Sequence, residues 1–191
     1  MKDQEKRVVI LNPPSSNEAY INRDLMGGMG VHITFGKNIF AQFLSKIKQN
    51  YVKIPVVQLV YAATLLEKNN YNVTVIDAAN ENMSLTTVLE KMQERQPTHV
   101  IMAVSSSCIL FERDVVAAKI KQAFPETMII VVGDMITEMP DLLLPHFDIG
   151  ITGEVENALL ELCSGEDPEK IPGLIIKQED TYIKTAPKNK L

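Results

Sequence analysis

The feature that most constrains the fold of this chain is a regular alternation of short apolar runs with stretches of helical periodicity. The apolar runs are rich in β-branched residues and carry little polar interruption, as expected of parallel strands buried on both faces. We predict five such strands, RVVILN (7–12), YNVTVID (71–77), THVIMAVS (98–105), TMIIVVG (127–133) and DIGIT (148–152).

The stretches between these runs have the spacing of amphipathic helices. In the first of them apolar residues recur at 56, 59, 60, 63 and 66, and Pro55 suits a first helical turn. Strands that alternate with helices require crossover connections, which are right-handed. The pattern therefore predicts an α/β chain with a flavodoxin-like (Rossmann-like), doubly wound, five-stranded parallel sheet. Further helices are predicted at 84–96, 112–124, 139–147 and about 154–163.

Two segments stand outside the alternation. The connection from Asn12 to Ile54 is far longer than a usual strand-to-helix loop, a length that is typical of functional or disordered segments. Its second half predicts an extra helix, because apolar residues from Ile39 to Ile47 fall on one stripe. Near the end, strands at 174–177 and 181–184 predict a hairpin. We expect a domain over 1–170, with 15–54 as enlarged loop and helix, and a hairpin and tail over 171–191.

Composition narrows the classes of partner. The net charge is −5 with scattered lysines, and no apolar run approaches the roughly 18 residues of a membrane span. The first residues lack the apolar core of a signal peptide. These features favour a cytoplasmic protein without nucleic-acid or membrane partners. Cys108 and Cys163 are the two cysteines, so the chain cannot by itself ligate a four-iron cluster, which takes at least three thiolates.

Ligands of open parallel sheets bind beyond the carboxyl ends of the strands. In this chain those ends carry small, hydroxylated or glycine-containing segments, without the acidic residues and lysine of a phospho-acceptor domain. Pro13 and Pro14 block a glycine-rich dinucleotide loop after the first strand, and a hydrolase Gly-x-Ser-x-Gly elbow is absent.

Several landmarks in order give this chain a family resemblance. They are VVILNPP, IPVVQLVYAATLLEKNNYNVTVIDA, PTHVIMAVS, AFPETMIIVVGD, FDIGITGEVE and IPGLIIK. The set resembles the N-terminal cobalamin-binding domain of class B radical S-adenosylmethionine enzymes, which include cobalamin-dependent methyltransferases and ring cyclases. The resemblance covers most of the chain outside residues 15 to 50. It implies a domain that holds cobalamin with its lower base detached from cobalt and tucked beside the sheet.

The resemblance also implies which residues contact the cofactor. Two departures from the family pattern add side chains where backbone approaches the ligand, Asp134 for a second glycine and Val155 for another. The cofactor-binding residues carried over are Asn12, Pro13, Pro14, Ser105, Ser106, Ser107, Gly133, Asp134, Gly153, Glu154 and Glu156. For the serines and Gly133 the alternative is a helix cap and a simple turn.

The family's catalytic half, with its Cys-x-x-x-Cys-x-x-Cys motif, is not in this sequence. We therefore expect a module that presents cobalamin to a radical domain in cis or in trans and catalyses nothing alone. S-adenosylmethionine and the [4Fe-4S] cluster would belong to that missing domain or partner. The alternative is a flavodoxin-like domain that binds flavin or another nucleotide, or a partner protein, without catalysis.

His32 is the candidate cobalt ligand. Classical cobalamin modules carry Asp-x-His-x-x-Gly, often continued by Lys-Asn-Ile, and here Gly36 begins Gly-Lys-Asn-Ile. Three residues rather than two separate His32 from Gly36, and Gly30 stands in the aspartate position. A ligating imidazole usually needs such a second acceptor to fix its tautomer. The pattern favours loop packing or a hydrogen bond to the corrin over ligation of cobalt.

Overall fold

A computed structural model gives the fold of the chain and describes residues 6–14, 36–51, 56–104, 108–143, 145–153 and 155–187. These residues form one seven-stranded sheet in the order β2-β1-β3-β4-β5-β6-β7. The strands are β1 (Arg7–Asn12), β2 (Asn72–Asp77), β3 (His99–Ala103), β4 (Met128–Val132), β5 (Ile149–Ile151), β6 (Leu174–Gln178) and β7 (Thr181–Lys184). Strands β1 to β5 pair with one another in parallel, whereas β6 pairs antiparallel with both β5 and β7.

The predicted five-stranded sheet is wrong in its count. Strand β6 does not stand apart as a separate unit, because it pairs along the edge of β5, with Ile149 opposite Ile176 and Ile151 opposite Leu174. The β5–β6 pairing is continued by the amide of Thr152, which donates to the carbonyl oxygen of Gly173 at 2.8 Å. The hairpin therefore extends the same sheet and covers the edge that β5 would otherwise expose.

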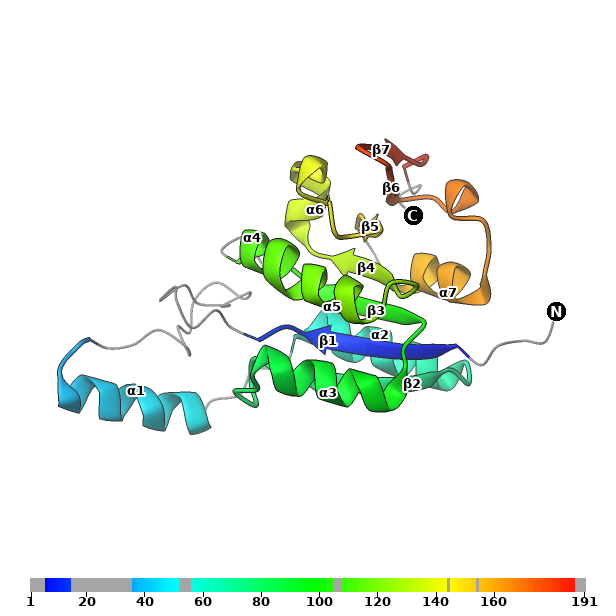
Figure 1. Ribbon diagram of the computed structural model, residues 1–191. Helices are drawn as coiled ribbons and strands as arrows, with labels where there is room; N and C mark the ends of the chain where they lie inside the picture. The colour runs from blue at the N-terminus through cyan, green and yellow to red at the C-terminus, as the bar shows by residue number, and fades with distance from the viewer. Residues whose placement is uncertain are drawn as a thin grey trace.

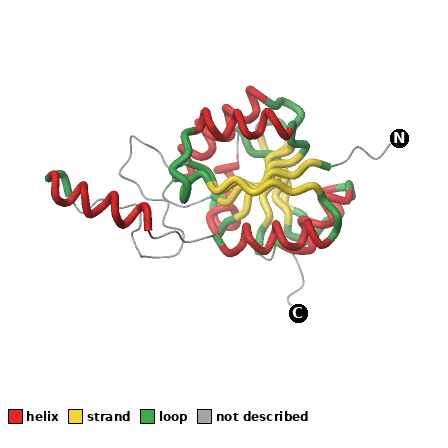
Figure 2. Tube along the Cα trace, turned by 90° about the horizontal axis from the view of Figure 1, so that it is seen from below, coloured by secondary structure: helices red, strands yellow, loops and turns green. Residues whose placement is uncertain are grey.

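Helices cover both faces of the sheet (Figures 1 and 2). Helices α2 and α7 pack on one face, and α3, η1 and α5 pack on the other. Figure 1 shows α1 to one side of the sheet. The helices are α1 (Ile39–Tyr51), α2 (Val57–Lys68), α3 (Leu85–Arg95), α4 (Ile109–Phe111), η1 (Glu112–Ala117), α5 (Ala118–Ala123), α6 (Asp134–Glu138), η2 (Pro140–Leu143), α7 (Glu156–Ser164) and η3 (Pro168–Lys170).

The alternation of side chains along β1 shows how the strands bury both faces. Val8 and Ile10 contribute to the core under α2 and α7, whereas Val9 and Leu11 contribute to the core under α3 and α5. All four are buried. This period of two on a fully covered strand is the physical reason that the sequence shows a continuous apolar run instead of an alternating one.

Local signals account for both ends of α3. Ser84 caps α3 by accepting a hydrogen bond from the amide of Thr87 at 3.1 Å, and the helix ends at Gln96 in the left-handed conformation. The helix predicted over 112–124 contains a π-helical segment, η1, and the one predicted over 139–147 is a short 3-10 helix, η2. None of the described helices combines the length and apolarity that crossing a bilayer requires.

Candidate functional site

The carboxyl ends of β1 and β3 lie at the point where the strand order reverses, which is where open α/β sheets bind ligands. Asn12, Pro13 and Pro14 are buried there. In the sequence, Ser105, Ser106 and Ser107 come shortly after β3. These serines, His32 and Glu154 lie outside the described residues. Their assigned roles stay predictions.

A hydrogen-bonded network joins the ends of β1 and β2. The side-chain amide of Asn12 donates to Asp77 Oδ1 at 2.6 Å, and the side-chain amide of Asn80 donates to Asp77 Oδ2 at 2.8 Å. The backbone amide of Ala78 donates to the carbonyl oxygen of Asn12 at 3.0 Å. Asn12 and Asn80 are both buried. Asp77 therefore holds the two amides in fixed orientations at this edge of the sheet.

Gly133 is placed by a close backbone contact at the end of β4. A Cβ at this position would lie 2.7 Å from the carbonyl oxygen of Val104, and the φ of Gly133 is +149°. The loop after β4 thus lies directly against the residue that precedes the three serines. Asp134 begins α6, the short helix that follows at once. The structure supplies a packing reason for glycine at 133 that is independent of any ligand.

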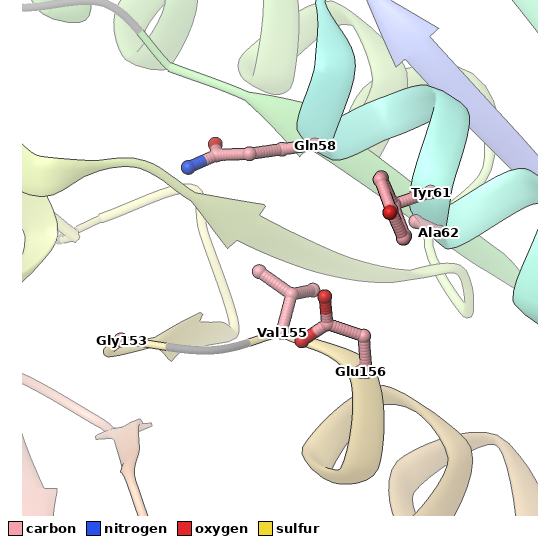
Figure 3. Close-up of a pocket in the computed structure, with 6 residues that line it drawn as sticks. All are labelled: Gln58, Tyr61, Ala62, Gly153, Val155 and Glu156. Atoms are coloured by element: carbon pink, nitrogen blue, oxygen red, sulfur yellow. The ribbon is translucent and has the colours of Figure 1, made fainter.

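A cavity of about 330 Å³ lies between the first turns of α2 and the start of α7. Figure 3 shows Tyr61 and Ala62 on α2 across from Val155 and Glu156, with Gly153 on the loop that follows β5. Small-molecule sites range over roughly 300–1,000 Å³, so this volume suits a flat, base-sized group and not an entire macrocycle. The lining residues are Gln58, Tyr61, Ala62, Gly153, Val155 and Glu156.

The cavity combines an apolar floor with polar groups at its rim. Ala62 and Val155 are buried, whereas Gln58 is exposed and Tyr61 keeps 63% of its surface exposed. Glu156 is in the first turn of α7, where a carboxylate is stabilised by the helix dipole. Space is open around Gly153, since a Cβ there would meet nothing within 4 Å. An incoming group can therefore reach the backbone of this loop.

The structure divides the described candidate residues into two groups. Gly153 and Glu156 line the cavity, whereas Asn12 to Pro14 lie at the end of β1 and Gly133 at the end of β4. Sequence reasoning missed Gln58 and Tyr61, which come from the first crossover helix. Their signal was weak: both are polar or amphipathic residues within a helix that otherwise reads as apolar.

Two residues with shifted pKa values lie away from this edge. His99 opens β3 at the amino edge of the sheet, and burial, followed by the charge of Lys6, lowers its pKa to about 4. Burial raises the pKa of Cys163, near the end of α7, to about 11. Both groups are therefore neutral near pH 7. Within the described ranges no three His, Cys, Asp or Glu side chains gather in a way that could hold a metal ion.

These features suit binding better than catalysis. The cavity can take a flat base, the open backbone at Gly153 admits a ligand alongside it, and one buried acceptor, Asn12 Oδ1, has no hydrogen-bond partner in the part of the chain that is described. A buried acceptor without a partner calls for an explanation, and a bound ligand with an N–H or O–H group would supply one. The residues present therefore fit a large ligand that carries both a base and N–H or O–H donors.

Comparison with protein families identifies the B12-binding domain. The model of the B12 binding domain matches residues 47–163, a range that includes α2, the cavity and the strand ends of β2 to β5. A search of curated proteins found no match.

Two solved structures of one enzyme share this fold. Both are of TsrM, a radical S-adenosylmethionine methyltransferase from Kitasatospora setae, at 19% identity and a TM-score of 0.66. One contains the tryptophan substrate and the analogue aza-SAM, and the match covers 96% of this chain and 31% of that one. The other contains cobalamin and a [4Fe-4S] cluster, with 95% and 29% covered. This chain thus spans about a third of the length of the structures it matches.

Proposed function

Because the chain belongs to the family of B12-binding domains and cobalamin is its cofactor, we propose that it is the cobalamin-holding module of a radical S-adenosylmethionine enzyme. Within this proposal the cofactor binds base-off, with its nucleotide base in the cavity between α2 and α7. The corrin then lies over the carboxyl edge, where β1, β3 and β4 end. Bound cobalamin supplies methyl-transfer or ring-forming chemistry at its cobalt.

The protein's own residues bind, orient and shield the cofactor. Ala62 and Val155 give the base an apolar contact surface, and Gln58 and Tyr61 offer hydrogen-bonding groups at the rim. The open backbone beside Gly153 leaves room for the part of the nucleotide that connects base and corrin. Gly133 keeps the β4 loop against the backbone of Val104 at this edge.

The reacting partner in this proposal is a radical domain, in the same protein or in a separate one. It would hold the S-adenosylmethionine and the [4Fe-4S] cluster. Both cysteines of this chain are buried, and they fall short of the three thiolates that such a cluster takes. The likeness to TsrM, of which this chain spans about a third, supports the same division between modules.

The proposal that cobalamin binds base-off rests on the cavity, because the cavity is where the nucleotide base would lie. A variant that fills the cavity therefore tests it. Gln58 is exposed and lines the cavity, so Gln58→Trp should occupy the space without disturbing the core. Kd is measured by absorbance titration for cobalamin and for cobinamide, which lacks the nucleotide base. We expect Gln58→Trp to weaken cobalamin binding by about tenfold or more, equivalent to about 1.4 kcal/mol, and to leave cobinamide within about twofold.

The matched control is Glu67→Trp, on the exposed side of the same helix and away from the cavity. It should leave both dissociation constants unchanged. Equal losses for cobalamin and cobinamide in Gln58→Trp would place the base elsewhere. Retention of flavin mononucleotide but not of cobalamin after desalting would overturn the proposal in favour of a flavin-binding domain.

A further inference from the structure

The side chain of Asn12 is buried at the carboxyl end of β1. Asn12 is 6% exposed, and its Oδ1 has no hydrogen-bond partner in the described part of the chain. A buried amide oxygen without a donor is destabilising, because it loses its water without replacement. Native structures retain few such groups, so each one calls for an explanation.

The orientation of the Asn12 amide is fixed by its neighbours. Asp77 Oδ1 lies 2.6 Å from Asn12 Nδ2, and a carboxylate attracts the amide's N–H group and repels its oxygen. Asp77 is itself held by Asn80, whose side-chain and backbone amides donate to it at 2.8 and 3.3 Å. Rotating the Asn12 amide by half a turn would bring two oxygens together. Oδ1 must therefore face away from Asp77.

The chain next to Asn12 cannot supply the missing donor. Pro13 and Pro14 follow directly, and proline has no backbone N–H. The carbonyl group of Asn12 is already used by the amide of Ala78. Asn12 Oδ1 is thus a buried, unpaired acceptor at the edge where the strand order reverses, and the two nearest residues of the loop cannot satisfy it.

We propose that Asn12 Oδ1 accepts a hydrogen bond from a primary carboxamide on the rim of the corrin, and that Asp77 and Asn80 are positioning residues that hold it in this state. The inference rests on the proposed function and deepens it by assigning the chemical group that the site selects. A corrin rim carries several carboxamides, each with two N–H donors. Asn12 Oδ1, held in place by Asp77 and Asn80, can accept a hydrogen bond from such a carboxamide. It repels a carboxylate at the same place, because a carboxylate oxygen would then face Oδ1.

The test uses cobalamin monocarboxylic acids, in each of which one rim carboxamide is hydrolysed. Kd is measured by absorbance titration for cobalamin and for each separate acid with the wild-type protein. We expect one acid to bind about tenfold or more weakly than cobalamin, and the others to bind within about threefold. Equal affinity for all the acids would overturn the proposal.

Asp77→Asn tests the positioning role. An asparagine at 77 can donate to Asn12 Oδ1, so that the Asn12 amide can turn and present Nδ2 to the ligand. We expect the disfavoured acid to regain affinity, and its Kd to equal that of cobalamin or fall below it. A merely structural role would lower all affinities together and keep their ratio. Asp180→Asn, which removes the same charge in the β6–β7 turn, should keep the wild-type ratio.

The outcomes separate this inference from the proposed function. If the wild-type protein binds no cobalamin, the proposed function fails and the carboxamide inference fails with it. If it binds cobalamin and all the acids alike, the carboxamide inference alone fails. Thermal unfolding of Asp77→Asn establishes whether the variant is folded, and the wild-type series tests the inference without it.

Discussion

The carbonyl oxygen of Val104 lies 2.7 Å from the position that a Cβ would take at Gly133, so the residue that follows β3 excludes any side chain at this position of the loop after β4. The opposing atom is backbone and cannot turn aside. Gly133 also has a φ of +149°, which residues with a side chain rarely adopt. Steric exclusion and backbone strain thus act at the same position.

Gly133→Ala should lower the free energy of unfolding by about 3 kcal/mol or more, because the clash adds to the strain of the backbone. Urea denaturation measures this change. Gly153→Ala is the matched control: its φ is also positive, at +75°, but a Cβ there meets nothing within 4 Å. The control should lose only about 1 kcal/mol. Equal losses of unfolding free energy in the two variants would show that the contact with Val104 does not destabilise Gly133→Ala.

The buried imidazole of His99 predicts a loss of stability in mild acid. Burial lowers its pKa from 6.5 to about 4, so the unfolded chain binds a proton at pH values where the folded chain does not. Stability is therefore complete above about pH 6.5 and falls as the pH drops toward 4. A shift of this size corresponds to about 3 kcal/mol. Chemical denaturation at intervals between pH 7 and pH 4 measures the loss.

His99→Gln is the control for this pH dependence. Glutamine does not titrate and can still reach the hydroxyl group of Thr98, which lies 2.8 Å from His99 Nδ1. The variant should lose the part of the acid sensitivity that His99 causes. If the unfolding free energy of His99→Gln falls between pH 6.5 and pH 4 as steeply as that of the wild type, the carboxylates cause the effect instead.

The strands could be predicted from the sequence because burial on both faces leaves a direct trace, a continuous apolar run. β1 was predicted with its bounds at Arg7 and Asn12. Short-range features were harder. α6 has five residues, too few to show a period, and the π-helical turn at Glu112 to Ala117 looks like ordinary helix in a pattern of apolar residues.

The cavity could be predicted only in part. Gly153 and Glu156 were named from the family resemblance, and both line the cavity. Gln58 and Tyr61 come from α2, and only the packing of α2 beside α7 brings them to the same space. Likewise, Asn12 was singled out by resemblance, but its fixed orientation depends on Asp77, which is distant in sequence and adjacent only through the pairing of β1 with β2.

Asp148 predicts a stability effect without an effect on the cofactor. Its Oδ2 accepts from the amide of Ile129 at 2.6 Å and lies 2.6 Å from Nζ of Lys121, at the amino ends of β4 and β5. Asp148→Ala removes the carboxylate and so breaks both of these interactions. The variant should lose about 2 kcal/mol of unfolding free energy. The Kd for cobalamin, measured under conditions where the variant is folded, should stay within about twofold. A larger change in this Kd would show that the amino edge of the sheet influences cofactor binding at the carboxyl edge.

His32→Ala should leave the absorbance spectrum of the bound cobalamin unchanged. The sequence places Gly30 where a cobalt-ligating histidine has its aspartate, so the imidazole lacks the usual acceptor that fixes its tautomer and raises its basicity. Removing a group that does not ligate cobalt leaves the electronic environment of the metal intact, whereas removing a ligand shifts the visible bands. His146→Ala serves as the comparison, since His146 precedes β5 at the amino edge of the sheet. A spectral shift in His32→Ala alone would identify His32 as the lower cobalt ligand.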